Sequence, residues 1–200
     1  MTLYTRRLWV NRLNLLVSLL AMLFGLFWLA WILFTLLDAG SRALTPELFL
    51  RMTPPPGSEG GLLNAMAGSL FMAAAGTLLG TPIGIMAGIY LAEFGRRGWL
   101  APATRFINDI LLSAPSIVIG LFIYEAYVVH VRHFSAWADI MALALIVIPV
   151  VIRTTENMLR LVPDSLREAA AALGAPHWKV ITFVTVRAAK AGIITGILLA

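Results

Sequence analysis

The chain contains no cysteine, and only 12% of its 200 residues are charged. The absence of cysteine excludes disulfides and thiolate metal sites. Soluble domains carry about 25% charged residues, so the shortage of charge excludes an ordinary water-soluble fold. What is present instead is 60% hydrophobic residues, with a mean hydropathy of +0.89. This composition indicates a protein whose main solvent is lipid.

Long runs without charge give the expected architecture, because a membrane-spanning helix needs about 20 apolar residues. The first run is too long for the apolar core of a signal peptide. We therefore expect an all-α, polytopic helical membrane protein forming one transmembrane domain over residues 1–200. The expected spans are 13–37, 62–92, 110–129, 135–152 and 180–200, with a loop at 153–180.

The last expected span is short. Its most apolar part begins at Ala191, and about ten residues of helix rise about 15 Å, half the thickness of the hydrocarbon layer. No polar tail follows. We therefore expect the natural protein to continue beyond Ala200 and to complete this span.

Lysine and arginine alternate between the connecting segments. The N-terminal segment carries three, the segment near 93–109 three and the segment near 153–190 six, whereas the two other loops together carry three. The counted residues are Arg6, Arg7, Arg12, Arg96, Arg97, Arg105, Arg153, Arg160, Arg167, Lys179, Arg187 and Lys190 against Arg42, Arg51 and Arg132; Glu59 is among the acidic residues of the first loop. The positive-inside rule places the N-terminus and the first set in the cytoplasm. Because the net charge of +5 follows this topology, nucleic acid is not an expected partner.

Catalytic and metal-binding patterns are missing. No Gly-x-x-x-x-Gly-Lys-Ser/Thr stretch exists that would bind ATP, and no nucleophile–base set stands out. His130 and His133 share one loop, but the topology places His177 across the membrane, so the histidines predict no metal site. We expect neither an enzyme nor a bound cofactor.

Small residues recur in the second expected span. Gly76, Gly80, Gly84 and Gly88 are four residues apart and fall on one face of a helix. Such a face lets a second helix approach closely. Two roles fit: simple helix packing, or a hinge that moves during function.

Few polar groups interrupt the apolar runs. Arg153 either anchors the end of the fourth span or contacts an anion, since its guanidinium can bind phosphate oxygens through two hydrogen bonds. Ser113 and Ser116 lie around Pro115 and either line a polar track or mark a helix start and kink. Glu125 is either an interfacial carboxylate or a pathway residue.

The stretch 165–176 has clear helix signals. Ser165 and Glu168 have the spacing of a capping box, which predicts a helix start at Ser165. Gly174 predicts a left-handed C-terminal cap, and Pro176 the first position of the next helix. Ala169, Ala170 and the next alanine offer a smooth surface for a groove on a partner, and Arg167, Glu168 and Lys179 offer charges to fix the register. A DNA-binding helix-turn-helix and a plain loop are the alternatives.

Glu168-Ala169-Ala170 followed by Gly174 is similar to the signature loop of ABC importer permeases. Residues 88–94, 108–118, 153–159 and 192–200 extend the match, and together they resemble the phosphate-specific importer permeases. The resemblance implies six spans, a sister permease, two ATPase subunits and an extracytoplasmic phosphate-binding protein. It implies that Ser165, Arg167, Glu168, Ala169, Ala170 and Gly174 couple to the ATPase. A permease for another solute, such as molybdate or sulfate, and a non-transporting scaffold or sensor remain alternatives.

Overall fold

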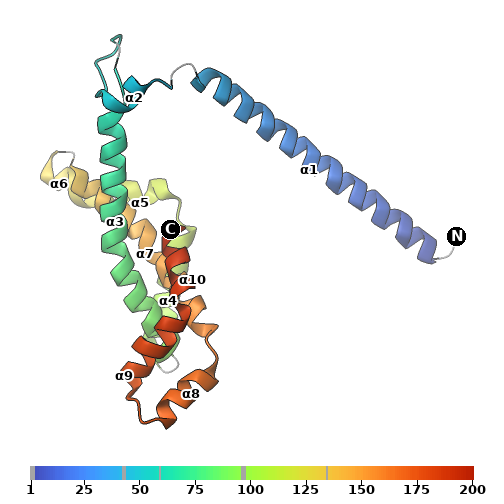
Figure 1. Cartoon of the computed structure of the whole chain (residues 1–200), viewed down its shortest axis with the longest axis vertical. Coiled ribbons are helices and arrows are strands. Elements are labelled where there is room, and N and C mark those ends of the chain that lie inside the picture. Colours follow the sequence, from blue (N-terminus) through green and yellow to red (C-terminus); the bar gives the residue numbers. More distant parts are fainter. Residues whose placement is uncertain (1–2, 42–43, 59, 96–97, 134) are drawn as a thin grey trace. The chain divides into compact units, whose positions relative to one another are not determined.

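The computed structural model describes residues 3–41, 44–58, 60–95, 98–133 and 135–200. Four charged residues of the topology count, Arg42, Glu59, Arg96 and Arg97, lie outside the described residues. The chain forms two compact units, Met1–Met66 and Ala67–Ala200. Every regular element of the described ranges is a helix, which confirms the all-α prediction (Figure 1).

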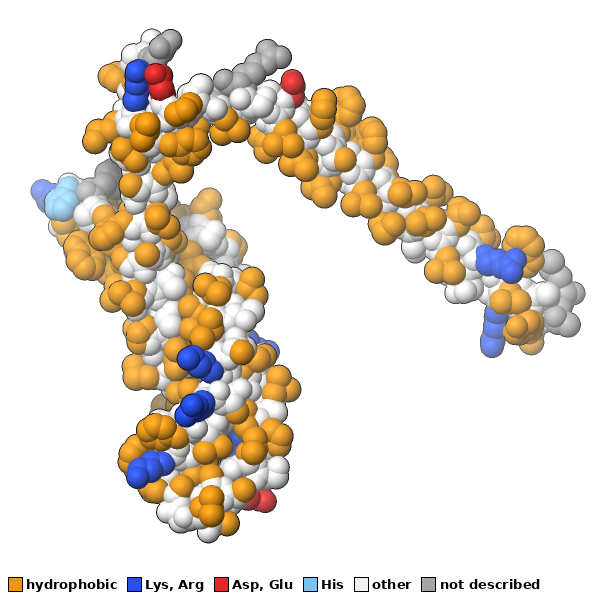
Figure 2. Space-filling model, in the orientation of Figure 1, with side chains coloured by type: hydrophobic (Ala, Val, Ile, Leu, Met, Phe, Trp, Pro, Cys, Tyr) orange, Lys and Arg blue, Asp and Glu red, His pale blue; other side chains and the backbone are white. Residues whose placement is uncertain are grey.

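The first unit is dominated by α1 (Leu3–Ser41), whose 39 residues correspond to a length of about 58 Å. Nearly all of its side chains are exposed, and most of them are apolar (Figure 2). The expected span 13–37 lies inside this helix. After α2 (Pro46–Leu50), the Asn64 side-chain oxygen accepts hydrogen bonds from the Thr53 amide at 2.9 Å and hydroxyl at 2.8 Å.

The second unit contains three further long apolar helices. α3 (Leu63–Ile89) enters it and continues as a π-helix, η1 (Tyr90–Phe94); α7 is Ala136–Arg160; and α9 (His177–Lys179), the π-helix η3 (Val180–Thr185) and α10 (Val186–Leu198) follow one another without a break. With α1, these make four helices among the described residues that are long and apolar enough to span a membrane. The expected spans 62–92, 135–152 and 180–200 lie largely within them.

The expected loop at 153–180 begins too early. α7 continues to Arg160, because Thr155, Glu156 and Leu159 extend its buried face for two more turns. Arg153 is therefore a helical residue rather than a loop residue. The segment α8 (Asp164–Ala172) follows and lies with α9 at one end of the second unit (Figure 1).

The expected third span, 110–129, lies in a bent pair of helices rather than in one straight helix. The chain forms α4 (Leu100–Ser113), α5 (Ser116–Ile123), the π-helix η2 (Tyr124–Val128) and α6 (Val129–Val131), with a bend of 103° after α4. Pro115 explains the break, since proline disfavours helical backbone in the residue before it. Ala114 accordingly has an extended ψ of 129°.

α7 is the central helix of the second unit and packs against α4, α5 and α10. It also faces Gly76, Gly80, Gly84 and Gly88 of α3, and these four glycines are buried. A methyl group added at Gly84 would lie 2.7 Å from Val151 Cβ, and one at Gly88 would lie 2.6 Å from Thr155 Cβ. Gly76 and Gly80 approach Leu143 and Val147 of α7 in the same way.

Candidate functional site

The start of α8 differs from the expected capping box. The helix begins at Asp164 with Pro163 at the N-cap, and no side chain caps its backbone. Ser165 is therefore inside the first turn, where its hydroxyl cannot serve as the cap. The reason is Pro163, whose φ of −60° and ψ of 140° already set the entry to the helix.

The end of α8 is as expected. Gly174 has a φ of +80°, which confirms the left-handed cap. Its amide donates to Ala171 O at 2.9 Å, and the Ala175 amide donates to Ala170 O at 3.3 Å. These two bonds form a Schellman motif, which turns the chain sharply towards α9. Pro176 is the N-cap of α9 rather than its first residue.

All six residues expected to couple to a partner are at least partly exposed, and five of them have no side-chain hydrogen bond or ion pair to the rest of the described chain. Ser165, Glu168 and Ala169 are exposed on one side of α8, Ala170 is half-buried, and Gly174 is exposed at the turn. Within the described part of the chain, the Glu168 side chain forms no hydrogen bond or ion pair, whereas the carboxylate of Asp164, one turn earlier, is paired with Arg167. Ser165, Glu168 and Ala169, with the exposed Ala172 one turn further on, form a surface that we call the α8 face.

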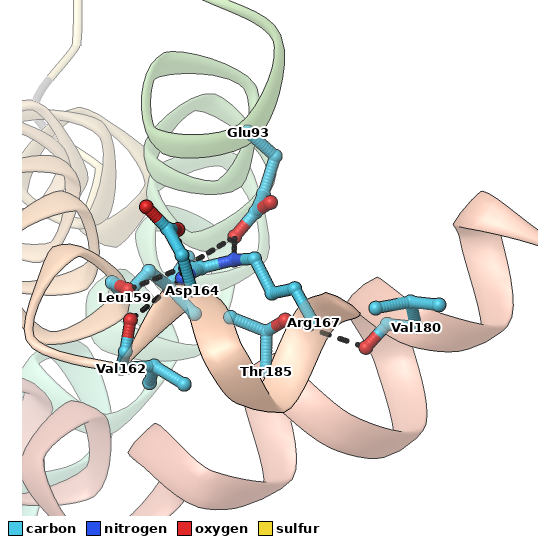
Figure 3. Close-up of polar contacts among 7 residues, drawn as sticks. All are labelled: Glu93, Leu159, Val162, Asp164, Arg167, Val180 and Thr185. Carbon is cyan, nitrogen blue, oxygen red and sulfur yellow. Dashed lines mark hydrogen bonds and ion pairs between the residues drawn. The ribbon is translucent and has the colours of Figure 1, made fainter. Parts of the chain in front are cut away.

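Arg167 points the other way, and its guanidinium is turned into the subunit (Figure 3). Its Nη2 lies 2.9 Å from Glu93 Oε1, and its Nη1 lies 3.0 Å from the exposed Asp164 carboxylate. It also donates to Val162 O at 2.6 Å and to Leu159 O at 2.8 Å. The Glu93 side chain is only 6% exposed. Arg167 is therefore engaged within the subunit.

A second ion cluster lies nearby, around Glu156 of α7. Its carboxylate is 4% exposed and accepts from Arg105 Nε at 2.9 Å and from Arg160 Nη2 at 2.6 Å. Arg105 also donates to Leu91 O of η1 at 3.1 Å. One buried carboxylate therefore joins α4 and α7, and Arg105 extends the connection to η1.

A surface pocket of about 560 Å³ lies beside these clusters. Its lining comes from the end of η1, the end of α7 and the first turns of α8, and includes Glu93, Arg160, Arg167 and Glu168. His177 also lines it and packs edge-on against Phe94 of η1, with ring centroids 5.4 Å apart. Basic side chains gather on the part of the second unit that holds α8 to α10 (Figure 2).

The candidate pathway residues lie along α4, α5 and α7. Arg153 is half exposed and lies 3.6 Å from Asp109 of α4. Ser113 donates to Ile110 O at 2.9 Å, and Ser116 is exposed at the start of α5. No hydrogen bond within the described ranges joins Arg153 to either serine. Glu125 is exposed on η2.

Three features of the site escaped the sequence-based reasoning. Glu93 and Glu156 are partners of arginines that are distant in sequence, and their only signal is a carboxylate at the end of an apolar run. Gly196 of α10 approaches α7 closely, because an added methyl group would lie 2.6 Å from Thr154 Cβ. The sequence feature that could have indicated this close contact is the glycine pair Gly192 and Gly196, whose spacing of four places both on one face of a helix. No group of residues suited to a metal ion occurs in the described ranges.

Comparison with known proteins gives close relatives. Residues 80–200 match the family described as binding-protein-dependent transport system inner membrane component. The chain is 63% identical over 189 residues to a phosphate transport system permease protein, PstA, of Pasteurella multocida, covering 94% of this chain and 68% of that protein. The PstA of Haemophilus influenzae is 61% identical over 168 residues, covering 84% and 60%, and that of Yersinia pestis is 61% identical over 191 residues, covering 95% and 65%. The chain therefore spans 60% to 68% of the length of these relatives.

Solved structures support the fold. A permease-containing structure of the MetNI methionine ABC transporter in an inward-facing conformation aligns with a TM-score of 0.61 at 24% identity, covering 69% of this chain and 67% of that chain. A second crystal form gives a TM-score of 0.56 at the same identity, covering 70% and 65%. The apolar helices and the family match indicate a multi-pass inner-membrane protein. The chain belongs to the family of binding-protein-dependent transport system inner membrane components.

Proposed function

We propose that this chain is a membrane-spanning subunit of an ATP-driven importer of inorganic phosphate. The observation that carries the proposal is its identity of 61% to 63% with three PstA permeases over most of its length. Its partners are a sister permease, ATP-binding subunits and a phosphate-binding protein on the outer side of the membrane. Its N-terminus and the α8 end of the second unit face the cytoplasm of a bacterium.

The α8 face is the contact for the ATP-binding subunit. Ser165, Ala169 and Ala172 are small and exposed, so a groove on the partner can close over them. Glu168 offers a charge to a cationic group of that groove. Hydrolysis takes place on the partner, and this subunit converts the movement of the groove into a movement of its spans.

The phosphate pathway includes Arg153, with Ser113 and Ser116 as neutral donors. The Arg153 guanidinium is half exposed, and its distance of 3.6 Å to Asp109 is longer than that of a well-formed charged hydrogen bond. A phosphate ion can therefore compete with Asp109 for this arginine. The glycines of α3 keep α3 and α7 close enough to move as a pair.

A reconstitution experiment tests the function. The complete transporter, with its ATPase and binding protein, is placed in proteoliposomes, and ATP-dependent accumulation of radioactive phosphate is measured with sulfate and molybdate as competitors. Phosphate accumulation that neither competitor reduces supports the proposal. Accumulation of one of the competitors instead identifies another cargo, and ATPase binding without accumulation of any anion identifies a scaffold or sensor.

A further inference from the structure

α8 is attached to the end of the α3–η1 helix through one side chain. The Arg167 guanidinium bonds Glu93 Oε1 with both Nε, at 3.3 Å, and Nη2, at 2.9 Å. The two residues are 74 positions apart in the sequence, so this contact joins elements that the chain itself connects only through α4, α5, η2, α6 and α7. Arg167 is 20% exposed and Glu93 6%, so the pair is largely withdrawn from water.

The remaining bonds of Arg167 fix its direction. Its Nη1 and Nη2 donate to Val162 O and Leu159 O, which are carbonyl oxygens at and just beyond the end of α7 (Figure 3). All three nitrogens of the guanidinium therefore have acceptors. Because the guanidinium is planar and rigid, this arrangement holds α8, α7 and η1 in one geometry.

Apolar packing contributes less to this attachment. Every residue of α8 is at least partly exposed, and the pocket of about 560 Å³ separates part of α8 from η1. α8 does pack against η3, which follows it in the chain. The link from α8 to η1, however, includes the ion pair of Arg167 with Glu93.

Glu93, the partner of Arg167, lies in η1, which is not a regular α-helix. η1 is a π-helix, and such segments often occur at functional sites within longer helices. It is held from a second side by Arg105, which donates to Leu91 O at 3.1 Å. A displacement of α8 that pulls on Glu93 therefore acts on the cytoplasmic end of α3, whose glycines lie against α7.

We infer that Arg167 is a positioning residue for energy coupling, which transmits the displacement of α8 to α3 through Glu93. This inference rests on the proposed function, in which an ATP-binding subunit moves α8. The role is distinct from docking, because the Arg167 guanidinium is bonded to Glu93 and to carbonyl oxygens of the subunit, whereas Ser165, Ala169 and Ala172 of the α8 face are exposed. Neutralising either member of the pair disconnects α3 from α8 without changing the α8 face.

The test uses the complete transporter in proteoliposomes and measures ATP hydrolysis and phosphate accumulation in the same sample. Glu93→Gln and Arg167→Gln are expected to retain the ATPase subunit and its hydrolysis, while phosphate accumulated per ATP falls about fivefold or more, the range of typical coupling between sites. The double variant is expected to be no worse than either single variant, because residues that act as a pair are not additive.

Asp164→Asn is the matched control. Asp164 also lies 3.0 Å from Arg167, but its side chain is 66% exposed and belongs to α8 itself. Its neutralisation leaves the Glu93 contact intact, so phosphate accumulated per ATP is expected to stay unchanged. A charge swap is uninformative, because a carboxylate at position 167 would face the carbonyl oxygens of Leu159 and Val162.

Several outcomes overturn the inference. Hydrolysis and accumulation that fall together in both variants, or a ratio that stays at the wild-type value, show that the pair only holds the fold. If Glu93→Gln fails to assemble, Arg167→Lys provides the test. Lysine keeps the positive charge but lacks the paired N–H donors of the guanidinium. A wild-type value of phosphate accumulated per ATP in Arg167→Lys would contradict the inference. Failure of the unaltered transporter to accumulate phosphate contradicts the proposed function instead.

Discussion

Arg167 and Glu168 are adjacent and line the same pocket, yet Arg167 is paired with Glu93 whereas the Glu168 side chain is exposed. Successive residues of a helix are rotated by about 100°, which turns Arg167 towards Glu93 and leaves Glu168 exposed on the α8 face. A single helical turn therefore combines an inward attachment with exposed side chains of the α8 face. A helix of nine residues is in this way bonded to η1 while its small side chains stay exposed.

The left-handed backbone of Gly174 predicts which substitutions this turn tolerates. An added side chain would meet open space, since nothing lies within 4 Å, but the φ of +80° strains any β-branched residue. Gly174→Val is expected to cost about 1–3 kcal/mol in the local fold of the turn and to reduce phosphate accumulated per ATP. Gly174→Asn is the control, because asparagine tolerates left-handed backbone. Equal accumulation per ATP by the two variants would contradict this role.

At the scale of elements, α7 is held by glycines from two helices. Gly84 and Gly88 of α3 contact Val151 and Thr155, and Gly196 of α10 contacts Thr154. The small residues remove side-chain volume between the helices, so backbone atoms and short side chains meet directly. α7 consequently connects the α3 side of the second unit to the α10 side.

Gly84→Ala is expected to lower the melting temperature of the detergent-solubilised protein. The new methyl group would lie 2.7 Å from Val151 Cβ, so the helices must separate; overpacking of this kind costs about 1–3 kcal/mol. Gly68→Ala on the same helix is the matched control, since the nearest atom there is Met72 Cε at 4.0 Å. Thermal unfolding of both variants checks the prediction, and an equal melting temperature would contradict close packing at Gly84.

The cluster around Glu156 predicts a difference between its two arginines. Arg105 is 29% exposed and joins α4 to α7 and η1, whereas Arg160 is 56% exposed and belongs to α7 itself. Both arginines share the buried Glu156, and removing one partner of a buried ion pair costs about 3–5 kcal/mol. Loss of Arg105 also removes its bond to Leu91 O, whereas the mostly solvated Arg160 is expected to contribute less. Arg105→Ala should therefore lower the melting temperature much more than Arg160→Ala. The reverse order would show that Arg160 is the main partner of Glu156.

Local sequence patterns predicted the helices and their ends better than the tertiary contacts between helices. Charge-free runs predicted the long helices, and Gly174 predicted the end of α8, because both features depend on neighbouring residues alone. A helix start and kink were predicted around Pro115 as one of two roles, but the span was still drawn as 110–129, since the apolar run continues across the proline. Glu93 and Arg167 could not be paired from the sequence, because 74 residues separate them and only the tertiary fold brings them together.

At the scale of the whole molecule, the absence of cysteine makes the proposed orientation testable. Single cysteines introduced at Thr5, Ser58 and Ser165, all exposed positions, provide unique labelling sites. The positive-inside rule places Thr5 and Ser165 in the cytoplasm and Ser58 outside. A membrane-impermeant maleimide should therefore label Ser58→Cys in intact cells and the other two variants only after permeabilisation.

The labelling uses cells that lack the ATP-binding subunit, so that no partner covers Ser165. Each variant is also labelled after detergent solubilisation, which gives the maximum signal for that cysteine. Labelling of Thr5→Cys and Ser165→Cys in intact cells, with protection of Ser58→Cys, would show the reverse orientation. The α8 face would then lie on the wrong side of the membrane for a cytoplasmic ATPase, and both the docking role and the coupling role of Arg167 would fail together.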